Sequence, residues 1–213
     1  YCSPACDHVS QPKAAVTQAH NLWGTFRHGY HQCSCPMSGT VSQRHDQYLE
    51  VIASTLRKHC GILAYTGQYL NKDSYSNKST DLLIVFPGDL HRRPIAIDYR
   101  CVCPFLATYR DQAKKSMESV LLPIAKGKEG KHSLHCDSSG RDFMAMPGTT
   151  LGSTGHKPFL DIIDVAWSRA IRRNLSGSEG RSIPEEKQAY YARLHAVLIR
   201  YTAYHIKTLS GNT

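Results

Sequence analysis

The sequence contains no long apolar run. No stretch approaches the ~18 consecutive apolar residues of a membrane-spanning helix, and no segment has the pattern of a secretory signal. We therefore expect no membrane partner. Because the chain begins with Tyr1 rather than Met, we expect it to be an excised part of a longer protein, whose targeting signals could have been lost.

Acidic residues are scarce relative to basic ones. The 213 residues include 17 Asp and Glu against 26 Lys and Arg, which gives a net charge of +9. Such a surface favours polyanions, because their counterions are released on binding. We expect DNA as the partner, with RNA also open, and Arg92, Arg93 and Lys157 as contacts. The alternative is a solvated basic face that has no partner.

The eight cysteines are unevenly spaced, and four of them fall in the first 35 residues beside several histidines. An even number of cysteines could indicate disulfides. Their spacing instead favours a small zinc-binding module over residues 1–42 and ordinary buried thiols elsewhere, in a reducing, intracellular compartment. The predicted zinc ligands are Cys2, Cys6, His31 and Cys35. Other residues could compete as ligands (Cys33, His28, His20 and His8), and an N-terminus without metal also remains open.

Apolar periodicity predicts an α/β fold for residues 43–213, with a mixed sheet flanked by helices. The predicted helices span 44–58, 106–122, 157–173 and a segment from near 184. The predicted strands span 62–65, 81–86, 94–98 and 142–146. Polar or glycine-rich loops are predicted at 71–79, 126–140 and 176–182.

Two aspartates mark the ends of neighbouring predicted strands. The turn residues Pro87-Gly88-Asp89 separate these strands, so folding at the turn brings Asp81 opposite Asp98. Paired carboxylates can hold a divalent cation, Mg²⁺ or Mn²⁺, for phosphodiester hydrolysis. The alternative is that the two aspartates only end their strands.

A cation near such a carboxylate pair would stabilise charge on a phosphate. Arg100 projects to the same side of its strand as Asp98, but a guanidinium does not give up its proton, so Arg100 is a candidate electrostatic stabiliser or a surface cation. Lys115, or its neighbour Lys114, could supply an amine from the following helix. For both lysines a solvated helix face is the alternative.

Two further candidates lie at the start of the first helix. His45 could orient the site or contact phosphate, and capping the helix or lying on the surface is the alternative. Glu50 lies just over one turn later and could be a third carboxylate near the metal.

An ordered series of motifs resembles the end of certain retroelement polyproteins, in which a zinc finger precedes a restriction-like endonuclease. These are non-LTR retrotransposons and related reverse-transcriptase-associated proteins. The series comprises Arg27-His-Gly-Tyr-His31 with Cys35, Gly39, Arg44-His45-Asp46, Thr80-Asp81, Ile97-Asp98, Ala113 with Lys115, Thr149-Thr150-Leu151-Gly152, Phe159-Leu160, and the helix around Arg193 to Ile199.

This resemblance implies a nuclear, Mg²⁺-dependent DNA endonuclease that nicks target DNA so that reverse transcription can start. By position it implies Asp81 and Asp98 as metal ligands, Lys115 as the catalytic amine, and a CCHC-type zinc module. Thr80 replaces the family's proline, and the family's upstream Glu has no counterpart here. A catalytically inactive nucleic-acid-binding domain, or a structural zinc protein, is therefore the alternative.

Overall fold

The computed structural model describes residues 40–69, 79–152, 156–173 and 181–209. The predicted zinc ligands and most of the predicted loops at 71–79 and 176–182 lie outside these ranges. Within them, no helix is both long enough and apolar enough to cross a membrane.

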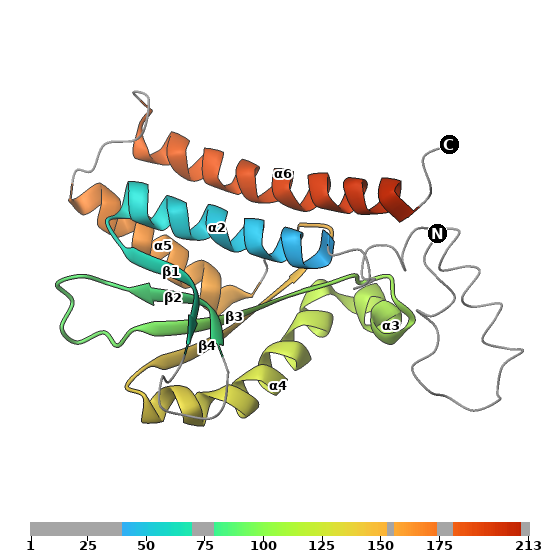
Figure 1. Ribbon diagram of the computed structural model, residues 1–213, viewed down its shortest axis with the longest axis horizontal. Helices are drawn as coiled ribbons and strands as arrows, with labels where there is room; N and C mark the ends of the chain where they lie inside the picture. Colours follow the sequence, from blue (N-terminus) through green and yellow to red (C-terminus); the bar gives the residue numbers. More distant parts are fainter. Residues whose placement is uncertain (1–39, 70–78, 153–155, 174–180, 210–213) are drawn as a thin grey trace, which may run out of the picture.

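Four strands form one mixed sheet, in the order in which they occur along the chain (Figure 1). The strands are β1 (Leu63–Tyr69), β2 (Ser79–Val85), β3 (Ile95–Val102) and β4 (Asp142–Thr149). The first three are antiparallel neighbours, and β4 runs parallel to β3 after a helical crossover. The α/β class and the mixed sheet predicted from the sequence are confirmed.

Helices cover both faces of the sheet (Figure 1). One face carries α2 (Thr40–Cys60), α5 (Lys157–Arg172) and α6 (Ile183–Leu209). The other carries α4 (Met117–Ser138), which follows the short helix α3 (Ala107–Lys115). The strands alternate accordingly: Leu82 and Ile84 join the large core under α2, whereas Leu83 packs with Cys136 of α4.

The large core lies between the sheet and α2, α5 and α6. Its largest fully buried side chains include Trp167, Tyr48, Tyr190 and Phe159. Burying one such side chain contributes about 1.5–3 kcal/mol. The core therefore holds three helices, which are distant in sequence, on one face of the sheet.

Two predicted helices are confirmed within a few residues at each end, and a third is confirmed at its start. α2 begins three residues before the predicted domain boundary at residue 43. It ends before Gly61, which has a left-handed φ of 60°. α5 matches its predicted span closely, and α6 has Pro184 in its first turn, where a missing N–H costs little.

The predicted loop at 126–140 is wrong, because these residues belong to α4 and its C-terminal end. The predicted helix at 106–122 is instead two helices that break at Ser116, whose hydroxyl accepts a hydrogen bond from the Ser119 N–H at 3.1 Å. Four apolar residues of α4 are buried: Val120, Leu121, Ala125 and Cys136. This burial outweighs the low helix propensity of the Lys/Gly-rich stretch.

Candidate active site

Asp81 and Asp98 lie where strands β2 and β3 stop pairing. The ladder between these strands joins Leu82 to Ile97, then Leu83 to Ala96 and Ile84 to Ile95. Asp81 and Asp98 are the next positions in this register, as the turn predicted. In place of a further ladder bond, the Tyr99 N–H donates to Asp81 Oδ2 at 2.6 Å. The two carboxyl groups also interact directly, and both side chains are less than a quarter exposed.

Helix α4 brings two basic side chains to Asp98. The Lys128 ammonium donates to Asp98 Oδ1, and His132 Nε2 lies 3.7 Å from Asp98 Oδ2. Lys128 and His132 are four residues apart and therefore share one face of the helix. The ring of His132 also packs against Phe143 of β4, with ring centroids 5.4 Å apart.

Neither Lys128 nor His132 was predicted from the sequence, because both fall in the stretch that was expected to be a loop. A helical reading of this stretch would have found them. Ala125, Lys128, His132 and Cys136 recur at intervals of three and four residues, which is the spacing of one helix face.

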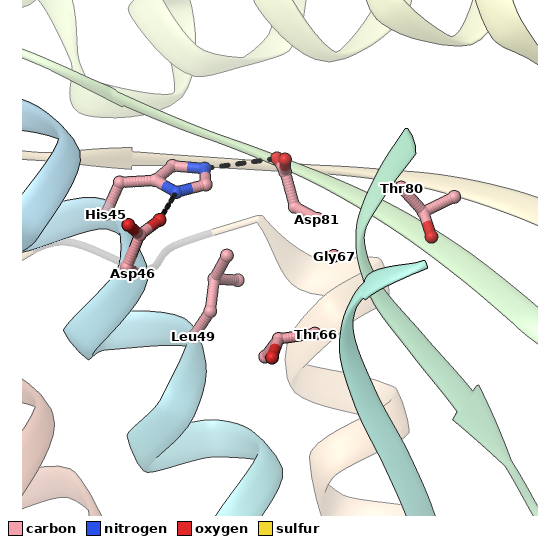
Figure 2. Close-up of a pocket in the computed structure, with 7 residues that line it drawn as sticks. All are labelled: His45, Asp46, Leu49, Thr66, Gly67, Thr80 and Asp81. Carbon is pink, nitrogen blue, oxygen red and sulfur yellow. Dashed lines mark hydrogen bonds and ion pairs between the residues drawn. The ribbon is translucent and has the colours of Figure 1, made fainter. Parts of the chain in front are cut away.

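Helix α2 brings His45 to Asp81 (Figure 2). His45 Nε2 lies 3.2 Å from Asp81 Oδ2, and His45 Nδ1 lies 3.0 Å from Asp46 Oδ1. The imidazole lies against Tyr99, which stacks on Tyr48 with ring centroids 4.7 Å apart. His45 is inside α2, since the helix begins at Thr40, so it does not serve as the helix cap.

A cavity of about 340 Å³ opens beside Asp81. Figure 2 shows that α2, β1 and β2 each contribute to its wall. Its volume would hold several water molecules, each of which occupies about 30 Å³ in the liquid. The lining residues are His45, Asp46, Leu49, Thr66, Gly67, Thr80 and Asp81.

The two carboxyl groups differ in pKa. Burial acts to raise the pKa of Asp81, but hydrogen bonds and charge from His45, with the Tyr99 N–H, outweigh it and lower the pKa. The pKa of Asp98 is raised by burial and by the nearby Asp81, which together outweigh the opposing effect of Lys128. Asp81 is therefore the more acidic member of the pair.

The imidazole of His45 is held between two carboxylates. Burial acts to lower its pKa, but hydrogen bonds to Asp81 and Asp46 outweigh this effect, so the pKa of His45 is raised. A protonated imidazole can donate from both ring nitrogens at once, which matches its two carboxylate contacts.

The donor set at the strand ends suits magnesium better than zinc. Mg²⁺ is commonly held by one or two protein carboxylates and completes its shell with water and substrate phosphate. Among the residues that the structure describes, no three His, Cys, Asp or Glu side chains are arranged as a metal-binding group. Asp81 and Asp98 fit a cation of this kind, whereas a site built only from protein ligands would need further donors.

The structure does not bring every predicted catalytic candidate to this pair. Arg100 is exposed on β3, and Lys115 is exposed on α3, a helix without buried residues. Lys114 pairs with Asp111 of the same helix at 2.9 Å. Glu50 accepts a hydrogen bond from Arg57 at 2.7 Å, on the exposed side of α2.

The predicted nucleic-acid contacts Arg92 and Arg93 lie in the turn between β2 and β3, beyond the end of β2 that is far from Asp81. Arg92 lies over the ring of Phe86, and Arg93 donates to Asp137 at 2.7 Å, which ties this turn to the end of α4. Lys157 pairs with Asp161 on α5 at 2.8 Å.

The four cysteines in the described ranges are free thiols. Cys60, Cys103 and Cys136 are buried and Cys101 is partly buried, and burial raises the pKa of Cys60 to about 12. Burial also raises the pKa of Cys101 and Cys136, as expected of structural thiols.

Comparison with known protein families finds no family model that matches the chain, and comparison with curated proteins finds no similar sequence.

Proposed function

We propose that this protein is a metal-dependent phosphodiesterase that acts on DNA as an endonuclease. The observation that carries the proposal is the carboxylate pair at the end of the β2–β3 ladder, with Lys128 bonded to one member. Two partly buried carboxylates and one ammonium, gathered from three elements, form the minimal set for stabilising a phosphodiester under attack.

In this proposal Asp81 and Asp98 hold Mg²⁺ or Mn²⁺. When bound, the cation supplies Lewis-acid stabilisation of phosphate charge and activates water as a nucleophile. The Tyr99 N–H and His45 both contact Oδ2 of Asp81, which fixes the orientation of the carboxylate.

Lys128 supplies the positive charge for the phosphate. Its ammonium is partly buried against Asp98, so a phosphate bound at that carboxylate's cation would lie within its reach. The ammonium is a compact donor with three N–H groups, and it can transfer between oxygen partners without moving the helix. Lys128 thus takes the role for which Lys115, Lys114 and Arg100 were the candidates in the sequence.

The biological setting rests on the resemblance to retroelement polyproteins. It supports a nuclear enzyme that nicks target DNA for integration, with a zinc module at residues 1–42. RNA remains a second possible partner, because the basic charge favours either polyanion.

One observation favours a second candidate, an inactive nucleic-acid-binding domain. Lys128 already neutralises Asp98, so a metal must compete with an internal cation. If Lys128 keeps that position, the carboxylate pair is structural, and the basic surface alone would bind DNA.

The test is cleavage of labelled single-stranded, duplex and branched DNA in the presence of Mg²⁺ or Mn²⁺. We expect metal-dependent cutting by the wild-type protein and none by Asp98→Ala. Asp164→Asn is the matched control, because this carboxylate is exposed on α5 and pairs only with Lys187 in the described residues.

Equal cutting by wild type and Asp98→Ala would contradict the assignment, since a contaminant would then explain the activity. Salt-sensitive binding without any cutting would support the inactive domain instead.

A further inference from the structure

Helix α4 presents a basic side to solvent beside the candidate active site. Lys126, Gly127, Gly130 and Lys131 are all at least partly exposed. At 100° per residue, the two glycines lie between the two lysines around the helix. Lys128, on the adjoining side of the helix, reaches Asp98. The exposed side is therefore contiguous with the carboxylate pair.

The lysines of this side are not neutralised by acidic neighbours. Lys114, Lys157 and Lys187 each pair with a carboxylate at 2.7–2.9 Å. Lys126 and Lys131 form no such pair within the ranges that the structure describes. Their charge is therefore available to an external anion.

The acidic residues of α4 are paired, lie off this side, or lie about two turns away from the two lysines. Asp137 pairs with Arg93 at 2.7 Å, and Glu129 faces His156 at 4.0 Å. Glu118 is in the first turn, away from Lys126 and Lys131. Between Lys126 and Lys131 this side therefore carries no acidic residue, and Asp137, farther along it, is paired with Arg93.

No described part of the chain packs on the two glycines of this side of α4. A Cβ added at Gly127 or Gly130 would meet no atom within 4 Å. No packing within the described chain explains these glycines, although glycine is unfavourable inside a helix. Because the two glycines have no side chains, the helix backbone between the two ammonium groups is exposed. An extended anion can approach this backbone closely.

We propose that this side of α4, defined by Lys126, Gly127, Gly130 and Lys131, is the surface on which the sugar-phosphate backbone of DNA docks. The proposal rests on the proposed function and deepens it, because it says how the substrate reaches Asp98. Five residues of helix rise about 7.5 Å, close to two phosphate steps of about 3.4 Å along a DNA axis. Lys126 and Lys131 would thus contact two separate phosphates of the backbone, and the contacts would be independent of base sequence.

The experiment measures binding of a fluorescein-labelled DNA duplex by anisotropy, at several salt concentrations and without divalent cations. The test variant is Lys126→Ala/Lys131→Ala. The control is Lys58→Ala/Lys187→Ala, which removes the same charge from α2 and α6. We expect a loss of affinity of about tenfold or more in the test variant, and a salt slope lower by about 2, as two lost phosphate contacts require. The control should change affinity by less than about twofold.

Equal losses in the two variants would overturn the docking surface, as would no loss in the test variant or binding that does not depend on salt. Cleavage is assayed separately, so the two proposals can fail independently. Loss of affinity in the test variant of a protein that does not cut DNA would support the surface and reject the nuclease. Normal affinity in a test variant that still cuts DNA would support the nuclease and reject the docking surface.

Discussion

The pKa of Asp98 is subject to opposing effects from its surroundings. Burial and the neighbouring Asp81 favour the neutral carboxyl group, whereas Lys128 favours the carboxylate. The net effect is a raised pKa. A divalent cation would act in the same direction as Lys128, so these two cations compete for one carboxylate.

Replacing Lys128 should therefore change the titration of Asp98. In Lys128→Ala we expect a further rise in the pKa of Asp98, because the group that lowers it is gone while burial remains. The measurement is a ¹³C NMR titration of the carboxyl carbons. Lys131→Ala is the control, since that ammonium is on the exposed side of the same helix. An unchanged Asp98 pKa in Lys128→Ala would refute the contact.

A second buried pair makes stability depend on pH. His59 packs near Trp167 and lies 3.6 Å from Glu186, which has no exposed side-chain surface. Burial, the largest effect, lowers the pKa of His59 below its usual 6.5, and it outweighs the opposing charge of Glu186. Well above pH 6.5 the imidazole is neutral in both the folded and the unfolded state, so it does not make the free energy of unfolding depend on pH in that range. As the pH falls through 6.5, the unfolded chain binds the proton first, and the free energy of unfolding decreases.

His59→Gln should remove this part of the pH dependence. We expect urea unfolding to show a smaller loss of stability on acidification from about pH 7.5 to about pH 5.5 in the variant than in the wild type, because glutamine binds no proton in either state. Groups remote from His59 titrate equally in the two proteins, so the difference isolates His59 and its pair with Glu186. Parallel pH profiles would show that His59 titrates normally in the folded protein.

At the scale of elements, the strand pair was predicted from the sequence and α4 was missed. The observed register is centred between Asp89 and Leu90, in the connection that begins with the predicted turn, so the proximity of Asp81 and Asp98 could be predicted from the local sequence. α4 forms because its apolar residues pack against β4, and its Lys/Gly-rich composition indicated a loop although Ala125, Lys128, His132 and Cys136 have the spacing of one helix face. Because this helix was missed, Lys128, whose ammonium contacts Asp98, was not predicted.

The glycines of α4 allow a direct test of its helical state. Gly130 is inside the helix and has open space around it, so Gly130→Ala should stabilise the protein by about 0.5–1 kcal/mol. Gly140 follows the helix with a φ of 69°, and the Arg141 N–H closes the end by donating to the Cys136 carbonyl at 2.9 Å. Gly140→Ala should destabilise by about 1–2 kcal/mol, because alanine disfavours left-handed backbone. Urea unfolding of both variants checks the pair, and destabilisation by Gly130→Ala would argue for a loop at this position.

At the scale of the whole molecule, the site depends on the two-sided sheet. α2 precedes the sheet in sequence and covers one face, while α4 lies in the crossover and covers the other (Figure 1). The ladder between β2 and β3 ends between these helices, so His45 reaches Asp81 and Lys128 reaches Asp98. The two helices, which lie on opposite faces of the sheet, thus each contact one of the two adjacent carboxylates.

We propose that Asp81 and Asp98 together form a single site for a divalent cation. The most direct measurement is calorimetric titration of the protein with Mn²⁺, comparing wild type with Asp81→Asn, Asp98→Asn and the control Asp164→Asn. We predict one binding event in the wild type and the control that is lost in both site variants. Retention of that event in either Asp81→Asn or Asp98→Asn would contradict a shared site.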